Sequence, residues 1–160
     1  MKRQTQRHLW AVGGAAALIL VCGLTDHLLR GTPPIAPVGC STLSFDTLRS
    51  WDYVEGKTPM PEHIQKLDGR YVQMTGFMMP LAQTRDISEF ILVPYVFGCC
   101  YGAPLAPNHM VIVQMPYGKT TQPVTGPFTV RGTFHSGEIR RDGALLSLYR
   151  LDAQEIVTRN

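Results

Sequence analysis

The pattern of hydrophobic and polar residues changes twice along the chain. Residues 9–24 are an apolar run, a proline-rich stretch follows, and from Arg70 onward short apolar and β-branched runs alternate with polar turns. A long apolar run predicts a membrane or signal segment, and short runs bounded by turn residues predict strands. We therefore divide the chain into a signal anchor or signal peptide (1–30), a proline-rich tether (31–40) and a folded domain (41–160).

The first segment carries its positive charge before the apolar run, at Lys2, Arg3 and Arg7. The run is slightly shorter than the ~20 residues of a typical spanning helix. It ends without the small residues of a signal-peptidase site, which favours an uncleaved anchor over a removed peptide. Because positive charge tends to stay in the cytoplasm, we expect a single pass through the inner (cytoplasmic) membrane at residues 9–24 and a periplasmic C-terminal domain. If the N-terminus is cleaved, the domain is secreted to the periplasm.

The charge of the folded part argues against nucleic-acid binding. The chain has 15 Lys and Arg residues and 12 Asp and Glu residues. Four of the basic residues and one of the acidic residues lie within 1–30, so the remainder carries 11 of each and is formally neutral. A neutral domain lacks the basic surface on which nucleic-acid binding depends. About 120 residues suffice for one small core, which predicts a single exported domain.

Five apolar or β-branched runs predict five short strands, at Tyr71–Leu81, Ile87–Val96, His109–Met115, Phe128–His135 and Ala144–Leu151. The last two runs are separated by Asp142-Gly143, a strong hairpin turn signal. Glycines inside the first and fourth runs suit strands that bend sharply to close a small barrel.

Helical signals are confined to the region before these strands. Ser44 is suited to cap a short helical turn, and Pro61 and Gly69 bracket a second one. The expected fold is therefore mainly β: a small five-stranded antiparallel OB-like barrel with short N-terminal helices, preceded by one transmembrane or signal-anchor helix. The alternative is an open five-stranded meander or sandwich.

The candidate chemistry lies between the second and third strands, in the segment FGCCYGAPLAPNH. Its glycines and prolines predict a sharply turned, rigid loop. Three cysteines reach the exported side, namely Cys40, Cys99 and Cys100, and an odd number cannot pair completely within one chain. At least one thiol is therefore free, metal-bound, lipid-modified or paired with another molecule. The adjacent cysteines are suited to a vicinal disulfide, to separate partners, or to a soft metal ion.

Few other side chains are placed to join the cysteines. His109 begins the third strand and is the candidate third metal ligand, while His135 is a weaker candidate at the end of the fourth strand. Met78, Met79 and Met110 lie at strand edges, where methionine usually fills a core. Two thiolates with imidazole suit Zn²⁺, and thiolates with thioethers suit Cu(I). The spacing matches no CxxC or HxxxH motif, so a structural disulfide and a functional thiol site both stay open.

Four blocks of the chain, GFMMPL, ILVPYVFGCCYGAPLAPN, VRGTFHSGE and LYRLDA, together resemble the bacterial envelope family called domain of unknown function 3299. The resemblance covers about residues 41–157 and implies a lipoprotein or secreted OB-like domain, encoded beside ABC-type exporter-like permeases and metal-uptake components. The family's loop pattern of a cysteine followed by prolines and asparagine falls here on Cys99, Pro104, Pro107 and Asn108. Some relatives carry a histidine two positions after that cysteine. This chain has Tyr101 there, so a Cys-x-His metal site does not carry over.

Three functions fit these observations. The first is a membrane-tethered periplasmic accessory that binds Zn or Cu through Cys99, Cys100 and His109, or assists an ABC-type transporter. The second is a non-catalytic envelope interaction module with a structural cysteine loop. The third is a thiol-disulfide redox protein, which lacks the CxxC motif and the helix N-terminus that lower a cysteine pKa. The chain has no nucleophile elbow, paired-carboxylate motif or phosphate loop, so no enzyme is expected.

Overall fold

A computed structural model describes residues 39–96 and 105–158 of the chain. The chain divides into two compact units, Met1–Pro33 and Pro34–Asn160, and all described residues belong to the second. Within these residues, no helix is long and apolar enough to cross a membrane. The proposed anchor at residues 9–24 lies outside the described ranges.

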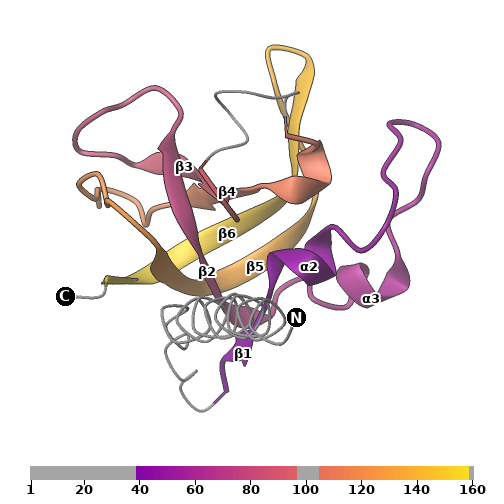
Figure 1. Ribbon diagram of the computed structural model, residues 1–160, viewed down its shortest axis with the longest axis horizontal. Coiled ribbons are helices and arrows are strands. Elements are labelled where there is room, and N and C mark those ends of the chain that lie inside the picture. The colour runs from indigo at the N-terminus through magenta and orange to yellow at the C-terminus, as the bar shows by residue number, and fades with distance from the viewer. Residues whose placement is uncertain (1–38, 97–104, 159–160) are drawn as a thin grey trace, which may run out of the picture. The chain divides into compact units, whose positions relative to one another are not determined.

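The described unit is mainly β (Figure 1). Its strands are β1 (Ser41–Thr42), β2 (Tyr71–Pro80), β3 (Glu89–Val93), β4 (Val111–Gln114), β5 (Phe128–Arg141) and β6 (Ala144–Thr158). Its helices are α2 (Phe45–Leu48), α3 (Glu62–Gln65) and the 3₁₀ turn η1 (Pro107–His109). All five expected strands are present, β5 and β6 extend well past the expected ends, and both expected short helices precede β2.

The strands form one six-stranded sheet in the order β1-β2-β3-β4-β6-β5, and β2 also pairs with β5. The pairings among β2 to β6 therefore run in a ring that returns to its first strand. Two pairings, β4 with β6 and β1 with β2, are parallel, so the sheet is mixed. The expectation of a purely antiparallel, five-stranded sheet was wrong on both counts. Because β6 lies between β4 and β5, a simple meander was wrong as well.

Glycine allows β2 to change partners along its length. Its first part, from Tyr71 to Gly76, pairs with β5, and its last part, from Phe77 to Pro80, pairs with β3. A Cβ placed on Gly76 would lie 2.6 Å from the carbonyl oxygen of Val93. Only glycine fits at this corner, which confirms the expectation that glycines mark sharp bends in the sheet.

The hairpin and the helix caps follow from local sequence. Arg141 pairs with Ala144, and both residues between them have positive φ, 52° at Asp142 and 81° at Gly143. Positive φ at both central positions is the geometry of a type I′ turn, which Asp-Gly favours. The Ser44 side chain accepts a hydrogen bond from the Thr47 amide and caps α2 as expected.

The main core is built from alternate positions on the five long strands, which point to one face of the sheet. It includes Val72, Met74, Phe90, Leu92, Val111, Val113, Phe128, Val130, Phe134, Tyr149 and Leu151, closed off by Leu48 and Ile64 of the helices. A second group, which we call the outer cluster, consists of Ile91, Val93, Met110 and Ile112 on the opposite face of β3 and β4. Burial on both faces explains why these two strands have continuous apolar sequences.

Candidate functional site

The structure fixes one end of the loop that carries the adjacent cysteines. Cys99 and Cys100 lie outside the described residues, but the chain is described again from Leu105, just before η1. The side chain of Asn108, only 2% exposed, donates a hydrogen bond to the carbonyl oxygen of Trp51 at 3.0 Å. This bond ties η1 to the segment that follows α2, more than fifty positions earlier in the chain.

A buried serine holds the other side of η1. The Ser147 hydroxyl donates to the carbonyl oxygen of Met110 at 2.8 Å and accepts from the Tyr149 amide at 3.1 Å. Together with the Asn108 bond, these contacts fix the backbone around His109 against β6. The imidazole of His109 is partly exposed at the end of η1. It therefore lies on a rigid support close in sequence to the cysteines.

The other side chains predicted as metal ligands lie in different parts of the domain. Met79 and Met110 belong to or border the outer cluster, whereas Met78 packs against the main core. His135 lies in a separate polar network on β5. In residues 39–96 and 105–158, no group of three His, Cys, Asp or Glu side chains is placed to hold a metal ion. Within the described ranges, the predicted ligands are therefore not brought together into a metal site.

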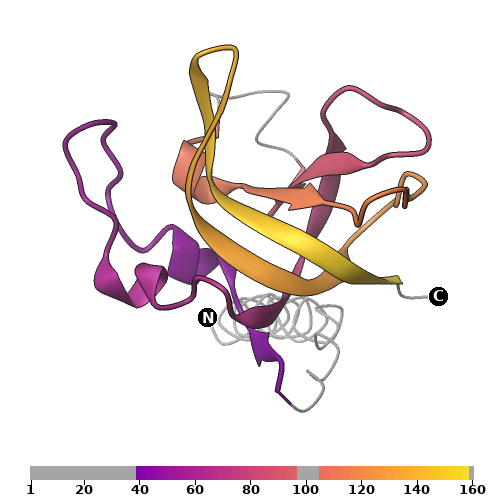
Figure 2. The same ribbon diagram turned by 180° about the vertical axis from the view of Figure 1, so that it is seen from behind.

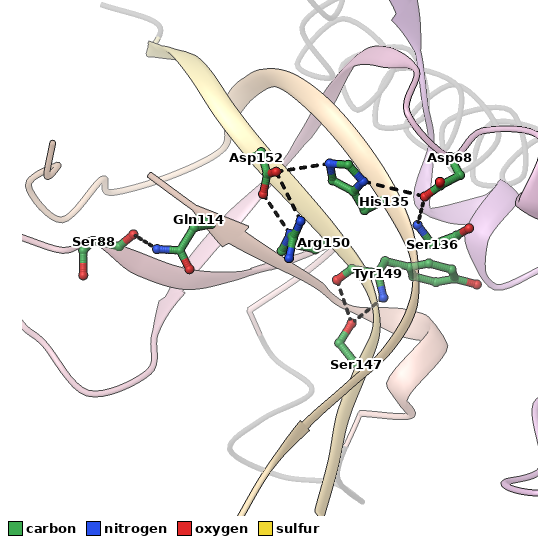
Figure 3. A network of polar contacts seen from close by, with 9 residues as sticks. All are labelled: Asp68, Ser88, Gln114, His135, Ser136, Ser147, Tyr149, Arg150 and Asp152. Carbon is green, nitrogen blue, oxygen red and sulfur yellow. Dashed lines mark hydrogen bonds and ion pairs between the residues drawn. The ribbon is translucent and has the colours of Figure 1, made fainter. Parts of the chain in front are cut away.

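Figure 3 shows the network around His135. Its Nε2 lies 3.1 Å from a carboxylate oxygen of Asp152, and its Nδ1 lies 3.7 Å from one of Asp68. Arg150 contacts the same Asp152 carboxylate at 2.8 Å, and Asp68 also accepts from the Ser136 amide at 2.8 Å. Both ring nitrogens of His135 thus face carboxylates. This arrangement suits a structural link between β5, β6 and the end of the helical region better than it suits the role of a general base.

A cavity with a volume of about 750 Å³ lies beside this network. One wall is the segment between α2 and α3, which contributes Trp51, Tyr53 and Met60, and the opposite wall is β5 at residues 136–138. In Figures 1 and 2 this segment and the β5–β6 hairpin project in the same direction from the sheet. Sequence reasoning missed this site, although two aromatic residues in a polar, proline-containing stretch were a usable signal.

The aromatic side chains of the cavity are held in place. The indole Nε1–H of Trp51 is directed at both the Leu48 carbonyl oxygen and the Tyr149 hydroxyl oxygen, each at 3.1 Å. The Trp51 and Tyr53 rings meet edge to face, with centroids 5.4 Å apart. Such an arrangement stabilises the pair by about 0.5–1.5 kcal/mol beyond its buried area.

Cys40 is the one cysteine within the described ranges, and its thiol is free. Burial raises the pKa of this thiol, and the nearby positive charge of Arg131 opposes the effect. A raised pKa lowers the thiolate fraction, and the thiolate is the reactive and metal-binding form. Cys40 is therefore a poor candidate for the chemistry of the cysteine loop.

Comparisons with known proteins give one family and one solved structure. The family model described as "Protein of unknown function (DUF3299)" matches residues 49–158. The structure is of a DUF3299 family protein from Pseudomonas aeruginosa PAO1, with a TM-score of 0.56 and 23% sequence identity. The alignment covers 76% of this chain and 97% of the other. No curated protein matches. At this identity the likeness shows the fold alone.

Proposed function

This chain belongs to the DUF3299 family, and we propose that it is a non-catalytic, membrane-tethered accessory of the bacterial envelope whose cysteine loop binds Zn²⁺ or Cu(I). The ligands would be the Cys99 and Cys100 thiolates and the His109 imidazole. The anchoring of η1 is the observation that carries the proposal. Because Asn108 and Ser147 fix the backbone on both sides of His109, only its side-chain torsions are left to be ordered when the imidazole binds a metal ion.

The barrel supports the loop in this proposal. We take the domain to be OB-like, with five strands closed into a barrel and β1 added at one edge. The ring of pairings from β2 through β3, β4, β6 and β5 back to β2 supports this view. So does the parallel pairing of β4 with β6, which are the third and fifth of these five strands in chain order. In such a barrel, a ligand site on a rigid loop is typical of the way binding residues are presented.

The membrane tether and the export of the domain rest on the sequence. Basic residues before the apolar run at 9–24, followed by prolines, predict a cytoplasmic N-terminus and a periplasmic domain. A reporter enzyme that works only in the periplasm should then be active when it is fused after Asn160. Activity of a reporter that works only in the cytoplasm would contradict this topology. A component of an ABC-type transporter is the partner that we propose for the exported domain.

Metal titration of the full-length, fully reduced protein tests the site. Wild type should bind one Zn²⁺ or Cu(I) nearly stoichiometrically, and Cys99→Ser and Cys100→Ser should each abolish tight binding. His109→Ala should weaken binding less, because thiolates contribute most of the affinity for soft ions. Cys40→Ser is the matched control and should bind as the wild type does. Reduced wild type that binds neither ion would end the proposal.

A structural cysteine loop is the second candidate, and the outer cluster favours it. Its four residues are all less than 10% exposed, and Leu105, at the described end of the loop, packs against them, as expected where the end of a loop is anchored on a sheet. In that case no metal binds, and removing a disulfide at Cys99 or Cys100 lowers stability by about 2–5 kcal/mol. A redox role would instead show as disulfide exchange between the wild type and a small thiol. Both Cys99→Ser and Cys100→Ser should lose this exchange.

A further inference from the structure

The cavity beside β5 is a preformed space rather than a gap between mobile segments. At one end, the Arg140 guanidinium on β5 contacts Glu55 of the facing wall at 2.6 Å and Glu138 at 3.0 Å. At the other end, Asp68 accepts a hydrogen bond from the Ser136 amide of β5 at 2.8 Å. Both contacts tie the helical region to β5 and hold the walls apart. A volume of about 750 Å³ lies within the range of small-molecule sites.

The β5 wall is irregular at this point. Ser136 pairs with Tyr149 of β6, but the next regular pair is Ile139 with Ser147. Two residues, Gly137 and Glu138, therefore lie opposite Leu148 alone, which is a β-bulge. A bulge leaves main-chain groups outside the ladder and is common beside binding sites. Gly137 and Glu138 both line the cavity, so this irregular part of β5 forms part of its wall.

The opposite wall contains a hydroxyl with no partner. Among the described residues, the Tyr53 hydroxyl oxygen is buried and makes no hydrogen bond. Burial raises the pKa of Tyr53, and the negative charges of Glu138 and Glu55 raise it further, so the phenol keeps its proton. A buried donor without an acceptor is costly, and each such group in a folded protein calls for an explanation.

The charges around the cavity favour a neutral ligand. Glu138 and Glu55 share Arg140, and Asp68 accepts from the Ser136 amide, so each of these carboxylates already has a partner within the protein. Lys57 adds one positive group to the rim. What the cavity offers is an apolar surface made by Trp51, Met60 and Leu148, surrounded by hydrogen-bonding groups of both kinds. A charged ligand would gain little here, whereas a neutral ligand with one apolar face and several hydroxyls would be matched.

From this geometry we infer that the cavity between Trp51 and Gly137 binds a neutral saccharide. A sugar ring has a face of C–H groups that packs on aromatic side chains and a periphery of hydroxyls that both donate and accept. The Tyr53 hydroxyl and the carboxylates of Glu138 and Asp68, which line the cavity, supply the matching partners. The inference is independent of metal binding, because none of the three proposed metal ligands lines the cavity.

Trp51 provides the readout. The chain has two tryptophans, so Trp10→Phe leaves Trp51 as the single tryptophan of the full-length protein, and excitation at the red edge of its absorption avoids the tyrosines. The protein is kept in a detergent without a sugar head group and titrated with tri-N-acetylglucosamine and with maltotriose. At least one trisaccharide should shift the emission of Trp51 saturably. Binding of the same sugar should be confirmed by saturation-transfer NMR.

Gly137→Phe blocks the cavity without disturbing the fold. A Cβ at this position meets no atom within 4 Å, so the melting temperature of the variant should equal that of the wild type. The added ring should occupy the cavity. It should weaken sugar binding at least about ten-fold, the equivalent of ~1.4 kcal/mol. Tyr117→Ala removes a fully exposed aromatic ring away from the cavity and is the matched control. The inference fails if neither trisaccharide shifts the emission, if Gly137→Phe binds normally, or if aromatic peptides bind at the cavity and sugars do not.

Discussion

Gly132 of β5 packs directly against the backbone of Asp152 on β6, where a Cβ on the glycine would lie 2.1 Å from the Asp152 carbonyl oxygen. The register of the two strands shifts here, since Arg131 pairs with Glu155 and Gly132 with Ala153. The close approach therefore coincides with a bulge on β6. It also lies where β5 contacts β2, because Gly132 pairs with Val72 on its other side.

Gly132→Ala should destabilise the domain strongly. The added methyl group meets backbone atoms on β6 that cannot rotate away, so the strands must separate locally, at a cost of about 1–3 kcal/mol or more. Urea denaturation measures the change. Gly137→Ala is the matched control on the same strand, has no atom within 4 Å of its Cβ, and should stay within about 0.5 kcal/mol of the wild type. Equal stability of the two variants would contradict the close approach.

Tyr149→Phe should lower stability by a modest amount. The Tyr149 hydroxyl donates to the Leu48 carbonyl oxygen at 2.9 Å and accepts from Trp51, which joins β6 to α2. The Leu48 carbonyl keeps Trp51 as a donor after the substitution, so we expect a loss of about 0.5–1.5 kcal/mol rather than the full cost of an orphaned group. Tyr117→Phe, at a fully exposed ring, should have no effect on the melting temperature.

The same tyrosine makes stability depend on alkaline pH. Burial raises the pKa of Tyr149 above its ordinary value of 10.0, partly opposed by the hydrogen bond from Trp51. The folded state thus holds this proton more tightly than the unfolded chain. The resulting stabilisation is complete below pH 10.0 and is lost as pH rises through the folded-state pKa. Melting temperature should therefore fall more steeply above pH 10.0 for the wild type than for Tyr149→Phe, and parallel curves would exclude this linkage.

Cys40 should react slowly with iodoacetamide in the native protein. Its raised pKa leaves less thiolate at neutral pH than an unperturbed cysteine would have. The rate should increase when the chain is unfolded in urea and when the pH is raised. Mass spectrometry of the peptide that contains Cys40 distinguishes it from the other cysteines. A native rate equal to the unfolded rate would show that burial does not control this thiol.

The strands could be predicted because their apolar runs are long and are interrupted by strong turn signals. The Asp142-Gly143 turn was located by its residue types alone, and Gly76 marked a corner in the sheet. What sequence could not supply was the order of the strands. The pairing of Ile112 with Arg150 depends on β6 passing between β4 and β5, and nothing in either local sequence specifies that neighbour.

The site was predicted less well, for a related reason. The cysteine loop stood out because paired thiols and prolines are adjacent in sequence, and its role stays a prediction. The cavity combines Trp51 and Tyr53 with Ser136 and Leu148, which are 83 to 97 positions away. Asp68 likewise meets His135 only through the fold. Groups of this kind become visible only when the packing of the helical region against the hairpin is known.

The place of β6 in the sheet has a consequence for how the domain is made. β6 is the last described strand in chain order, yet it is the strand that joins β4 to β5. Until β6 has been synthesised, β4 lacks its parallel neighbour and the ring of pairings stays open. Contacts between residues so far apart in sequence also form slowly. Folding of the ring should therefore be completed only after synthesis of β6, and the unfinished chain, with its open strand edges, should be prone to aggregation until then.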